Sequence, residues 1–339
     1  MFHYRLQKLL SRHLVLAVAC IFLSLVLSLG NIATVTAAEP QPKRPLRVVA
    51  SFSTLGDMVR NVGGDLVQVN VLVGPNADAH VFEPTPTDAR RVAEADLVIV
   101  NGLKFEGWLD RLVSASGYRG PVIVATLGVQ PRFLNGQADP HAWQSLGNAR
   151  HYIENIRVAL AKSLPAHAAL INARAGDYLM RIDALDRDIK KRFAEIPSSQ
   201  KRVIISHDAF GYYGDAYGVE FFSPQGWSTT SEAAAKQVAG IIQQIKSQRA
   251  RVLFVENITD PRLMQRISRE AGGVMGGTLY SDALSAPGSA ADTYLKMFEH
   301  NSTTLIQAIV RSNANTGANP SPKAKSTTVP VKRDQINAR

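Results

Sequence analysis

Short apolar runs rich in β-branched residues recur along the chain, separated by stretches with helical periodicity. This alternation is typical of α/β proteins, because parallel strands need a crossover helix between them. The runs fall into two groups of four, one on each side of a long segment without strand signals, so each half of the chain can form its own sheet. The candidate strands are 46–51, 67–73, 96–101 and 121–125, then 202–206, 219–222, 251–256 and 274–280.

The segment between the two groups has helical periodicity throughout. Pro165 interrupts it and Pro197 ends it, which predicts one helix up to about Ser163 and a connector helix over about 166–196. The connector carries one apolar stripe, formed by Leu179, Ile182, Leu185, Ile189 and Phe193. A chain of 339 residues suits two lobes. We therefore predict an α/β fold with two lobes, each a mainly parallel sheet flanked by helices, joined by one long rigid connector helix. The predicted ranges are 39–164 for the N-terminal lobe, 165–197 for the connector and 198–311 for the C-terminal lobe.

The first 38 residues have the pattern of an export signal. Three basic residues precede the apolar run 14–29, and small residues at 36–38 provide a cleavage site. We predict a signal peptide over 1–38 and a periplasmic mature protein. An uncleaved membrane anchor is the alternative, because the apolar run is only slightly shorter than a membrane span. A lipoprotein site at Cys20 is less well supported, because the residues that follow it stay apolar.

Both ends of the chain also concentrate its charge. The formal net charge is +10, but three basic residues without an acid lie before residue 39, and five with one acid lie after residue 311. The remaining body is only weakly basic, which argues against a nucleic-acid partner. Residues 312–339 are polar with almost no large apolar side chain, and we predict a disordered tail there.

Three of the eight histidines, and one aspartate, follow candidate strands directly or within a loop. The carboxyl edge of an open α/β sheet is where ligands bind, and each half of the chain contributes two of these residues. Removal of the signal would leave no cysteine, so any metal site must use nitrogen and oxygen ligands. Three imidazoles and a carboxylate suit Zn²⁺ and can also serve manganese or iron, although the spacing alone is equally compatible with structural histidines. The four residues are His80, His141, His207 and Asp282. His151, His167 and His300 lie in polar helical stretches, where we expect surface side chains.

At these positions the sequence resembles the metal-specific solute-binding proteins of ABC importers, the zinc and manganese receptors of the ZnuA and TroA type. The matching segments are Asp78-Ala79-His80-Val81-Phe82-Glu83-Pro84-Thr85-Pro86, Asp139-Pro140-His141-Ala142-Trp143, Ser206-His207-Asp208-Ala209-Phe210, Phe254-Val255-Glu256 and Ser281-Asp282, and the resemblance runs from about Val48 to about Ile309.

The resemblance implies that His80, His141, His207 and Asp282 are metal ligands, two from each lobe. It also implies two lobes bridged by a long helix, a metal ion as cargo and the membrane permease of an ABC importer as partner. We expect a monomer that captures the ion without catalysis. Asp208, Glu83 and Glu256 are candidates for orienting the imidazoles, although each can equally be an ordinary cap or surface charge.

The metal and the activity have alternatives. Many zinc receptors of this family carry a histidine-rich loop before the second ligand, and residues 130–138 contain no histidine. Nitrogen at His207 favours Zn²⁺, with Mn²⁺ or iron as the alternative cargo. An exported metallohydrolase is less well supported, because the chain has neither a metalloprotease histidine pair on one helix nor a nucleophile-elbow motif. A surface adhesin or scaffold would have no strong metal affinity.

Overall fold

The computed structural model describes residues 44–134, 136–247 and 250–317, which belong to one compact unit covering 41–339. The predicted signal peptide, with its anchor and lipoprotein alternatives, lies outside the described residues, as does the predicted tail from residue 318 onward. None of the helices in the described part is both long and apolar enough to cross a membrane.

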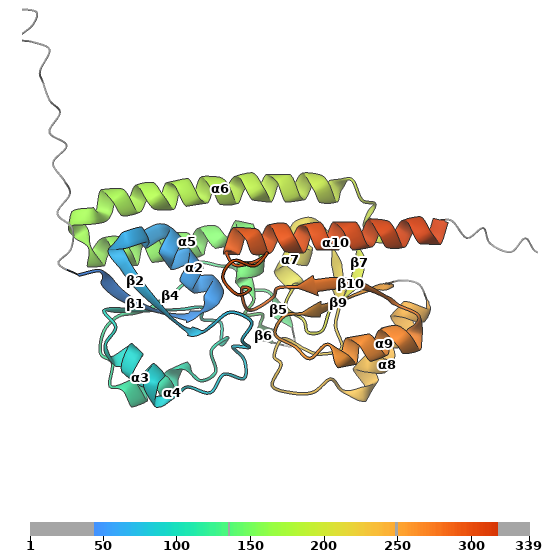
Figure 1. Cartoon of the computed structure of the whole chain (residues 1–339), viewed down its shortest axis with the longest axis horizontal. Coiled ribbons are helices and arrows are strands. Elements are labelled where there is room, and N and C mark those ends of the chain that lie inside the picture. Colours follow the sequence, from blue (N-terminus) through green and yellow to red (C-terminus); the bar gives the residue numbers. More distant parts are fainter. Residues whose placement is uncertain (1–43, 135, 248–249, 318–339) are drawn as a thin grey trace, which may run out of the picture. The chain divides into compact units, whose positions relative to one another are not determined.

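The first half of the chain forms a four-stranded parallel sheet in the order β2-β1-β3-β4. Apolar strands are flanked on both faces by helices, with α2 and α5 on one side and α3 and α4 on the other (Figure 1). Thr85 begins α3 with a capping box that it shares with Asp88. The elements are β1 (Leu46–Phe52), α2 (Ser53–Gly63), η1 (Gly64–Leu66), β2 (Val67–Val73), α3 (Pro86–Ala93), β3 (Leu97–Val100), α4 (Leu109–Ser116), β4 (Val122–Val124), η2 (Ala142–Gln144) and α5 (Leu146–Ser163).

The second half repeats this topology. Its parallel sheet has the order β10-β9-β7-β8, so in both sheets the first strand along the chain pairs with the second and third, and the fourth pairs with the third. The elements are η4 (Ser198–Gln200), β7 (Arg202–Ile204), α7 (Gly211–Tyr217), β8 (Glu220–Phe222), α8 (Ala235–Lys246), β9 (Val252–Glu256), α9 (Arg262–Ala271), β10 (Val274–Leu279) and α10 (Tyr294–Gly317).

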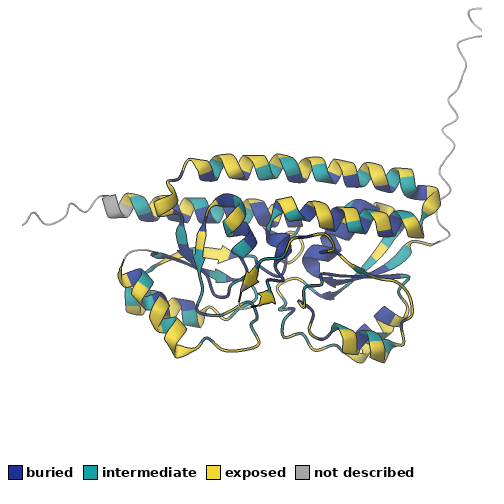
Figure 2. Cartoon of the chain, turned by 180° about the vertical axis from the view of Figure 1, so that it is seen from behind, coloured by how far each residue is buried: buried dark blue, intermediate teal, exposed yellow. Residues whose placement is uncertain are grey.

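A helix of 27 residues, α6 (Ala168–Ala194), connects the two halves after the short turn η3 (Pro165–His167). It packs against α5 and α2 of the first half and against α10 and α7 of the second. Figure 2 shows one buried stripe along a helix whose other faces are exposed. Ile182, Ile189 and Phe193 of the predicted stripe are buried, while Leu179 and Leu185 pack at its margin.

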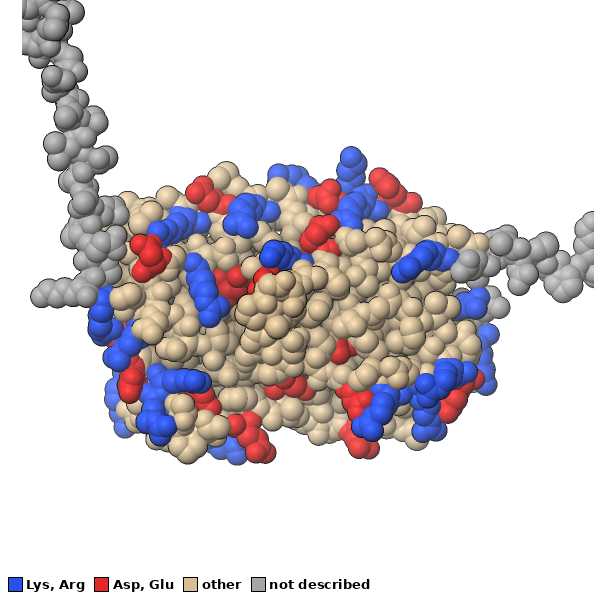
Figure 3. Space-filling view, viewed as in Figure 1, with Lys and Arg blue, Asp and Glu red and all other residues tan. Residues whose placement is uncertain are grey.

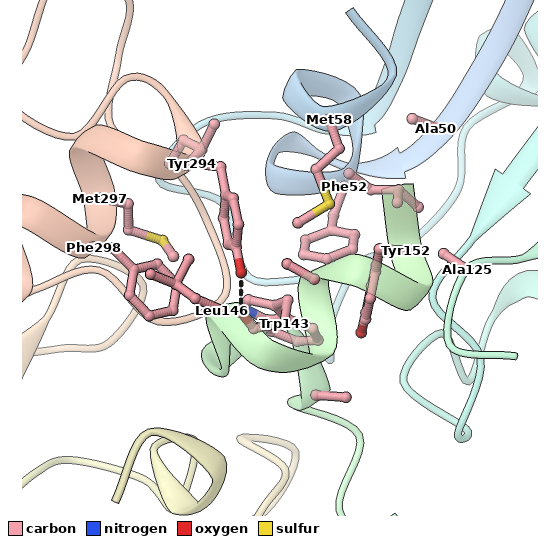
Figure 4. Packing of buried hydrophobic residues seen from close by; sticks show 14 of the residues in the cluster. Ala50, Phe52, Met58, Ala125, Trp143, Leu146, Tyr152, Tyr294, Met297 and Phe298 are labelled. Atoms are coloured by element: carbon pink, nitrogen blue, oxygen red, sulfur yellow. Dashed lines mark hydrogen bonds between the residues drawn. The ribbon is translucent and has the colours of Figure 1, made fainter. Parts of the chain in front are cut away.

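The main core is continuous across both halves. Phe52 and Trp143 from the first half lie in the same cluster as Tyr294 and Phe298 of α10 (Figure 4). A second, smaller cluster lies between the second sheet and the helices α8 and α9. Its members are Ile204, Ile241, Ile245, Ala250, Leu253, Met264 and Ile267.

The predicted fold class is confirmed: two parallel four-stranded sheets flanked by helices, with a long helix between them in the chain.

Several local expectations need correction. A short hairpin, β5 (Phe133–Leu134) with β6 (Gln137–Ala138), was missed because two-residue strands leave no periodic signal. His167 is buried, because it lies in the turn between α5 and α6. Helix α10 continues to Gly317, so residues 312–317 of the predicted disordered tail are helical, and Asn313 donates to Gln200 Oε1 at 3.0 Å.

Candidate metal centre

The four residues selected from the sequence lie together at the carboxyl edges of the two sheets. His80 lies in the loop after β2 and His141 follows β4 and the short hairpin, while His207 follows β7 and Asp282 follows β10. One ligand atom from each residue lies within 4.8 Å of those of the other three. Residues as far apart in the chain as 80 and 282 meet here because parallel strands bring their carboxyl ends to the same edge of a sheet.

The distances between these side chains suit a single ion. Nε2 of His80 lies 3.4 Å from Nε2 of His141 and 3.2 Å from Asp282 Oδ2. Nε2 of His207 lies 3.4 Å from Asp282 Oδ2, and Nε2 of His141 lies 3.7 Å from Asp282 Oδ1. Two ligand atoms bound tetrahedrally to zinc, each about 2.0–2.1 Å from the ion, are separated by about 3.3 Å. The spacing of the four groups therefore fits a tetrahedral dication.

Buried carboxylates orient two of the imidazoles. Asp139 Oδ1 lies 2.8 Å from Nδ1 of His141, and Glu256 Oε2 lies 2.7 Å from Nδ1 of His207. Each carboxylate faces the Nδ1–H side of its ring, so Nε2 faces the centre, where its lone pair can bind a metal once the ring is neutral. The same carboxylates accept the backbone N–H groups of His141 and His207, at 3.0 and 2.9 Å.

Only one of the three candidates for this orienting role contacts an imidazole. Glu256 does so, whereas Glu83 is exposed. Asp208 N donates to Gly226 O, and no contact between its carboxylate and an imidazole is present in the described residues. Asp139 was missed, although its position two residues before His141, in Asp139-Pro140-His141, was visible in the sequence. An aspartate at this spacing can accept the backbone N–H of the histidine and reach its ring, which is the signal that would have identified it.

Burial makes the charges in the centre depend strongly on one another. Burial alone would lower the pKa of His207, but Glu256 and Asp282 outweigh it and raise this pKa well above its ordinary value. Burial alone would raise the pKa of Asp282, but His207 and His141 together lower it well below its ordinary value. A protonated His207 against an ionised Asp282 is therefore the stable pair without a metal, and a bound cation would replace that proton.

Three of the four side chains at the centre are buried, and the fourth lines a cavity. The side chains of His141, His207 and Asp282 are fully buried, whereas 5% of the His80 side chain is exposed. His80 lines a cavity of about 620 Å³. The other lining residues are Leu103, Lys104, Phe105, Gly107, Phe133, Gly136, Gln137, Ala138, Pro140, Trp227, Ser228 and Thr230. Of the four groups at the centre, His80 is the one that lines this cavity.

A family model described as zinc-uptake complex component A, periplasmic, matches residues 48–308 of the chain. The chain belongs to this family. It is 32% identical over 265 residues to the manganese-binding lipoprotein MntA of Halalkalibacterium halodurans, which covers 78% of this chain and 88% of that protein. The iron-binding protein YfeA of Yersinia pestis is also 32% identical, over 284 residues that cover 81% of this chain and 91% of YfeA.

Solved structures show the same relationship. The periplasmic zinc-binding protein TroA of Treponema pallidum matches with a TM-score of 0.75 and 28% identity, over 78% of this chain and 99% of TroA. The resemblance inferred from the histidine motifs is therefore confirmed, and the chain is a metal-binding, substrate-binding protein of the ABC-transporter type. The names of these relatives refer to manganese, iron and zinc, so membership leaves the metal to be decided by the centre itself.

Proposed function

We propose that this protein captures a transition-metal dication outside the cytoplasm and delivers it to the membrane permease of an ABC importer. The observation that carries the proposal is the convergence of three imidazoles and one carboxylate on a single point. We propose His80, His141, His207 and Asp282 as the ligands. The two sheets would then belong to two lobes, over 39–164 and 198–311, with 165–197 as the connector.

We propose Zn²⁺ as the cargo, with Mn²⁺ or iron as the alternative. Three nitrogen ligands favour zinc over manganese, because imidazole suits zinc whereas manganese prefers oxygen-rich sites. The contact distances fit a tetrahedral shell. Both oxygens of Asp282 face imidazoles, however, and a carboxylate that binds through both oxygens would raise the coordination number, which suits manganese better.

Capture, rather than catalysis, follows from the number of protein ligands. A catalytic zinc keeps one position for an activated water, whereas four protein groups complete a tetrahedral shell. Charged side chains of both signs are interspersed on the face shown in Figure 3, which favours a small cargo over a nucleic acid. We expect a monomer.

The decisive experiment is native mass spectrometry with elemental analysis of the full chain, purified from the compartment to which it is exported. We expect one metal ion per chain, with zinc predominating. His207→Glu should shift the preference toward manganese or iron, because it replaces a nitrogen ligand with oxygen. A wild-type protein that retains no metal, or that hydrolyses an ester, peptide or phosphate in a metal-dependent way, would contradict the proposal.

The same mass spectrum tests the export signal. We expect a mature chain beginning near Glu39, in the periplasm. A lipid-modified chain beginning at Cys20 would instead indicate a lipoprotein, the class named for the MntA relative, and a chain that keeps residues 1–38 would indicate an uncleaved anchor.

A further inference from the structure

The loop that carries Asp282 belongs to the second half of the sequence, yet the first half also holds its backbone. The carbonyl of Ser281 accepts two hydrogen bonds, from Trp143 Nε1 at 3.0 Å and from Gln144 Nε2 at 2.7 Å. All of these residues are fully buried. Trp143 and Gln144 lie two and three residues after His141, so one short turn links the second and the fourth ligand directly.

Further along the same loop, Leu284 is held at both of its backbone groups. Its N–H donates to Ser53 Oγ and its carbonyl accepts from Asn76 N, each at 2.9 Å. The second half holds the same loop as well, through two bonds between Asn301 of α10 and the backbone of Tyr280 and one from Asn257 Nδ2 to Ala283 O at 3.1 Å. The amide of Asn257 also reaches Asn76 Oδ1. The backbone around Asp282 is therefore attached to both halves, and the two bonds at Ser281, the residue before Asp282, come from the first half.

His207, by contrast, is held by contacts within its own half of the chain. Its backbone N–H and its ring both contact Glu256, and its backbone forms a bridge with Gln225. These partners all come from the second half of the chain. Asp282 thus follows a strand of the second half but is tied to the turn after His141, whereas these contacts of His207 stay within the second half.

We propose that Trp143 and Gln144 are positioning residues that fix Asp282 beside His141 through the carbonyl of Ser281. Together with Ser53, which holds Leu284, they tie the Asp282 loop to the half of the chain that carries His141. Figure 4 shows how Trp143 itself is held, with its carbonyl accepting from the hydroxyl of Tyr294 at 2.6 Å. This inference rests on the proposed binding of metal by the four residues.

The test uses substitutions that each remove one donor, and Gln144→Met also keeps the approximate shape of the side chain. Gln144→Met and Trp143→Phe each delete one hydrogen bond to Ser281, and Asn155→Leu is the matched control. Asn155 also donates through its amide to backbone carbonyls, those of Ala125 and Leu127, but in the described residues its amide bonds neither Ser281 nor any of the four proposed ligands. Dissociation of Zn²⁺ is followed by stopped-flow mixing with a chelator, and Co²⁺ absorption reports the geometry of the centre.

We expect Gln144→Met and Trp143→Phe each to speed Zn²⁺ release about fivefold, the effect of one net hydrogen bond on the bound state, and to shift the Co²⁺ spectrum. Asn155→Leu should leave the Zn²⁺ release rate and the Co²⁺ spectrum unchanged. It should lower the unfolding temperature of the metal-free protein by about as much as Gln144→Met and Trp143→Phe do. If Gln144→Met and Trp143→Phe release Zn²⁺ at the wild-type rate with an unaltered Co²⁺ spectrum, the inference is wrong.

Two other outcomes are distinguishable. A wild-type chain that binds neither Zn²⁺ nor Co²⁺ contradicts the proposed function itself. If the substitutions at Trp143 and Gln144 prevent folding, Ser53→Ala decides, because it removes the acceptor of Leu284 N without touching the turn after His141. It should also speed Zn²⁺ release, and a wild-type rate would overturn the inference.

Discussion

His207 and His80 contribute equivalent atoms to one centre, but their surroundings differ. His207 is fully buried, and its ring contacts Glu256 on one side and Asp282 on the other. His80 lines the open cavity, and its backbone N–H, at 2.8 Å from Asp78 Oδ1, is its contact with a carboxylate outside the centre. The comparison teaches that buried carboxylates hold the ring of His207 on both sides, whereas His80 can be reached from the cavity.

The largest difference should appear when each histidine is removed. His207→Ala leaves the carboxylates of Glu256 and Asp282 buried without their partner, and we expect Zn²⁺ affinity to fall about 1000-fold, which corresponds to roughly 4 kcal/mol. His80→Ala should have a smaller effect, because water from the cavity can occupy the vacated position. Chelator-competition titration measures both, and equal losses would break the comparison.

The buried carboxylate behind His207 should have the next largest effect. Glu256→Gln removes the charge that orients the ring, and we expect a tenfold to hundredfold loss of Zn²⁺ affinity. Glu83→Gln is the control, because Glu83 is an exposed carboxylate in the motif that contains His80. The same competition titration applies, and a comparable loss in the control would show that the effect is not specific to His207.

The pH dependence should also originate at His207. Its pKa is raised, so at neutral pH the ring is protonated without metal, and binding must release that proton. We expect Zn²⁺ affinity to increase about tenfold per pH unit as long as the pH stays below this pKa. Calorimetry in buffers of different ionisation enthalpy counts the released protons. Glu256→Gln should lower the pKa of His207 and reduce the number of protons released on Zn²⁺ binding at pH 7. An unchanged number would refute the assignment of the pH dependence to His207.

The smallest effect should come from the rim of the cavity. Phe133 lines the cavity beside His80 but is 66% exposed. We expect Phe133→Ala to change Zn²⁺ affinity by no more than about twofold, as is usual for exposed side chains. A larger loss in a titration would mean that the cavity side of the centre is as fixed as the His207 side.

Local patterns predicted the strands well, because buried parallel strands are apolar along their whole length. Val67–Val73 agrees at both ends with β2, and the other seven predicted strands overlap with observed ones. The ends of α6 were misplaced by two residues each, at Ala168 and Ala194, since the turns on either side continue the helical geometry. The two-residue strands β5 and β6 are too short for any period to identify.

The sequence was less informative about what surrounds the ligands. It offered Glu83, Asp208 and Glu256 on equal terms, and only the folded chain shows that Glu256 faces an imidazole while Glu83 faces solvent. The partner of His141 is Asp139, which the motif contained but which sequence reasoning did not select.

By itself the sequence determined the alternation of strands and helices, the helix between the two groups of strands and the absence of thiol ligands after residue 38, because all of these are local properties of the chain. Tertiary structure alone decided that four distant side chains lie within 4.8 Å and that the Asp282 loop is anchored to the opposite half. Such contacts depend on how two separately formed sheets pack together, and no local period in the sequence records that packing.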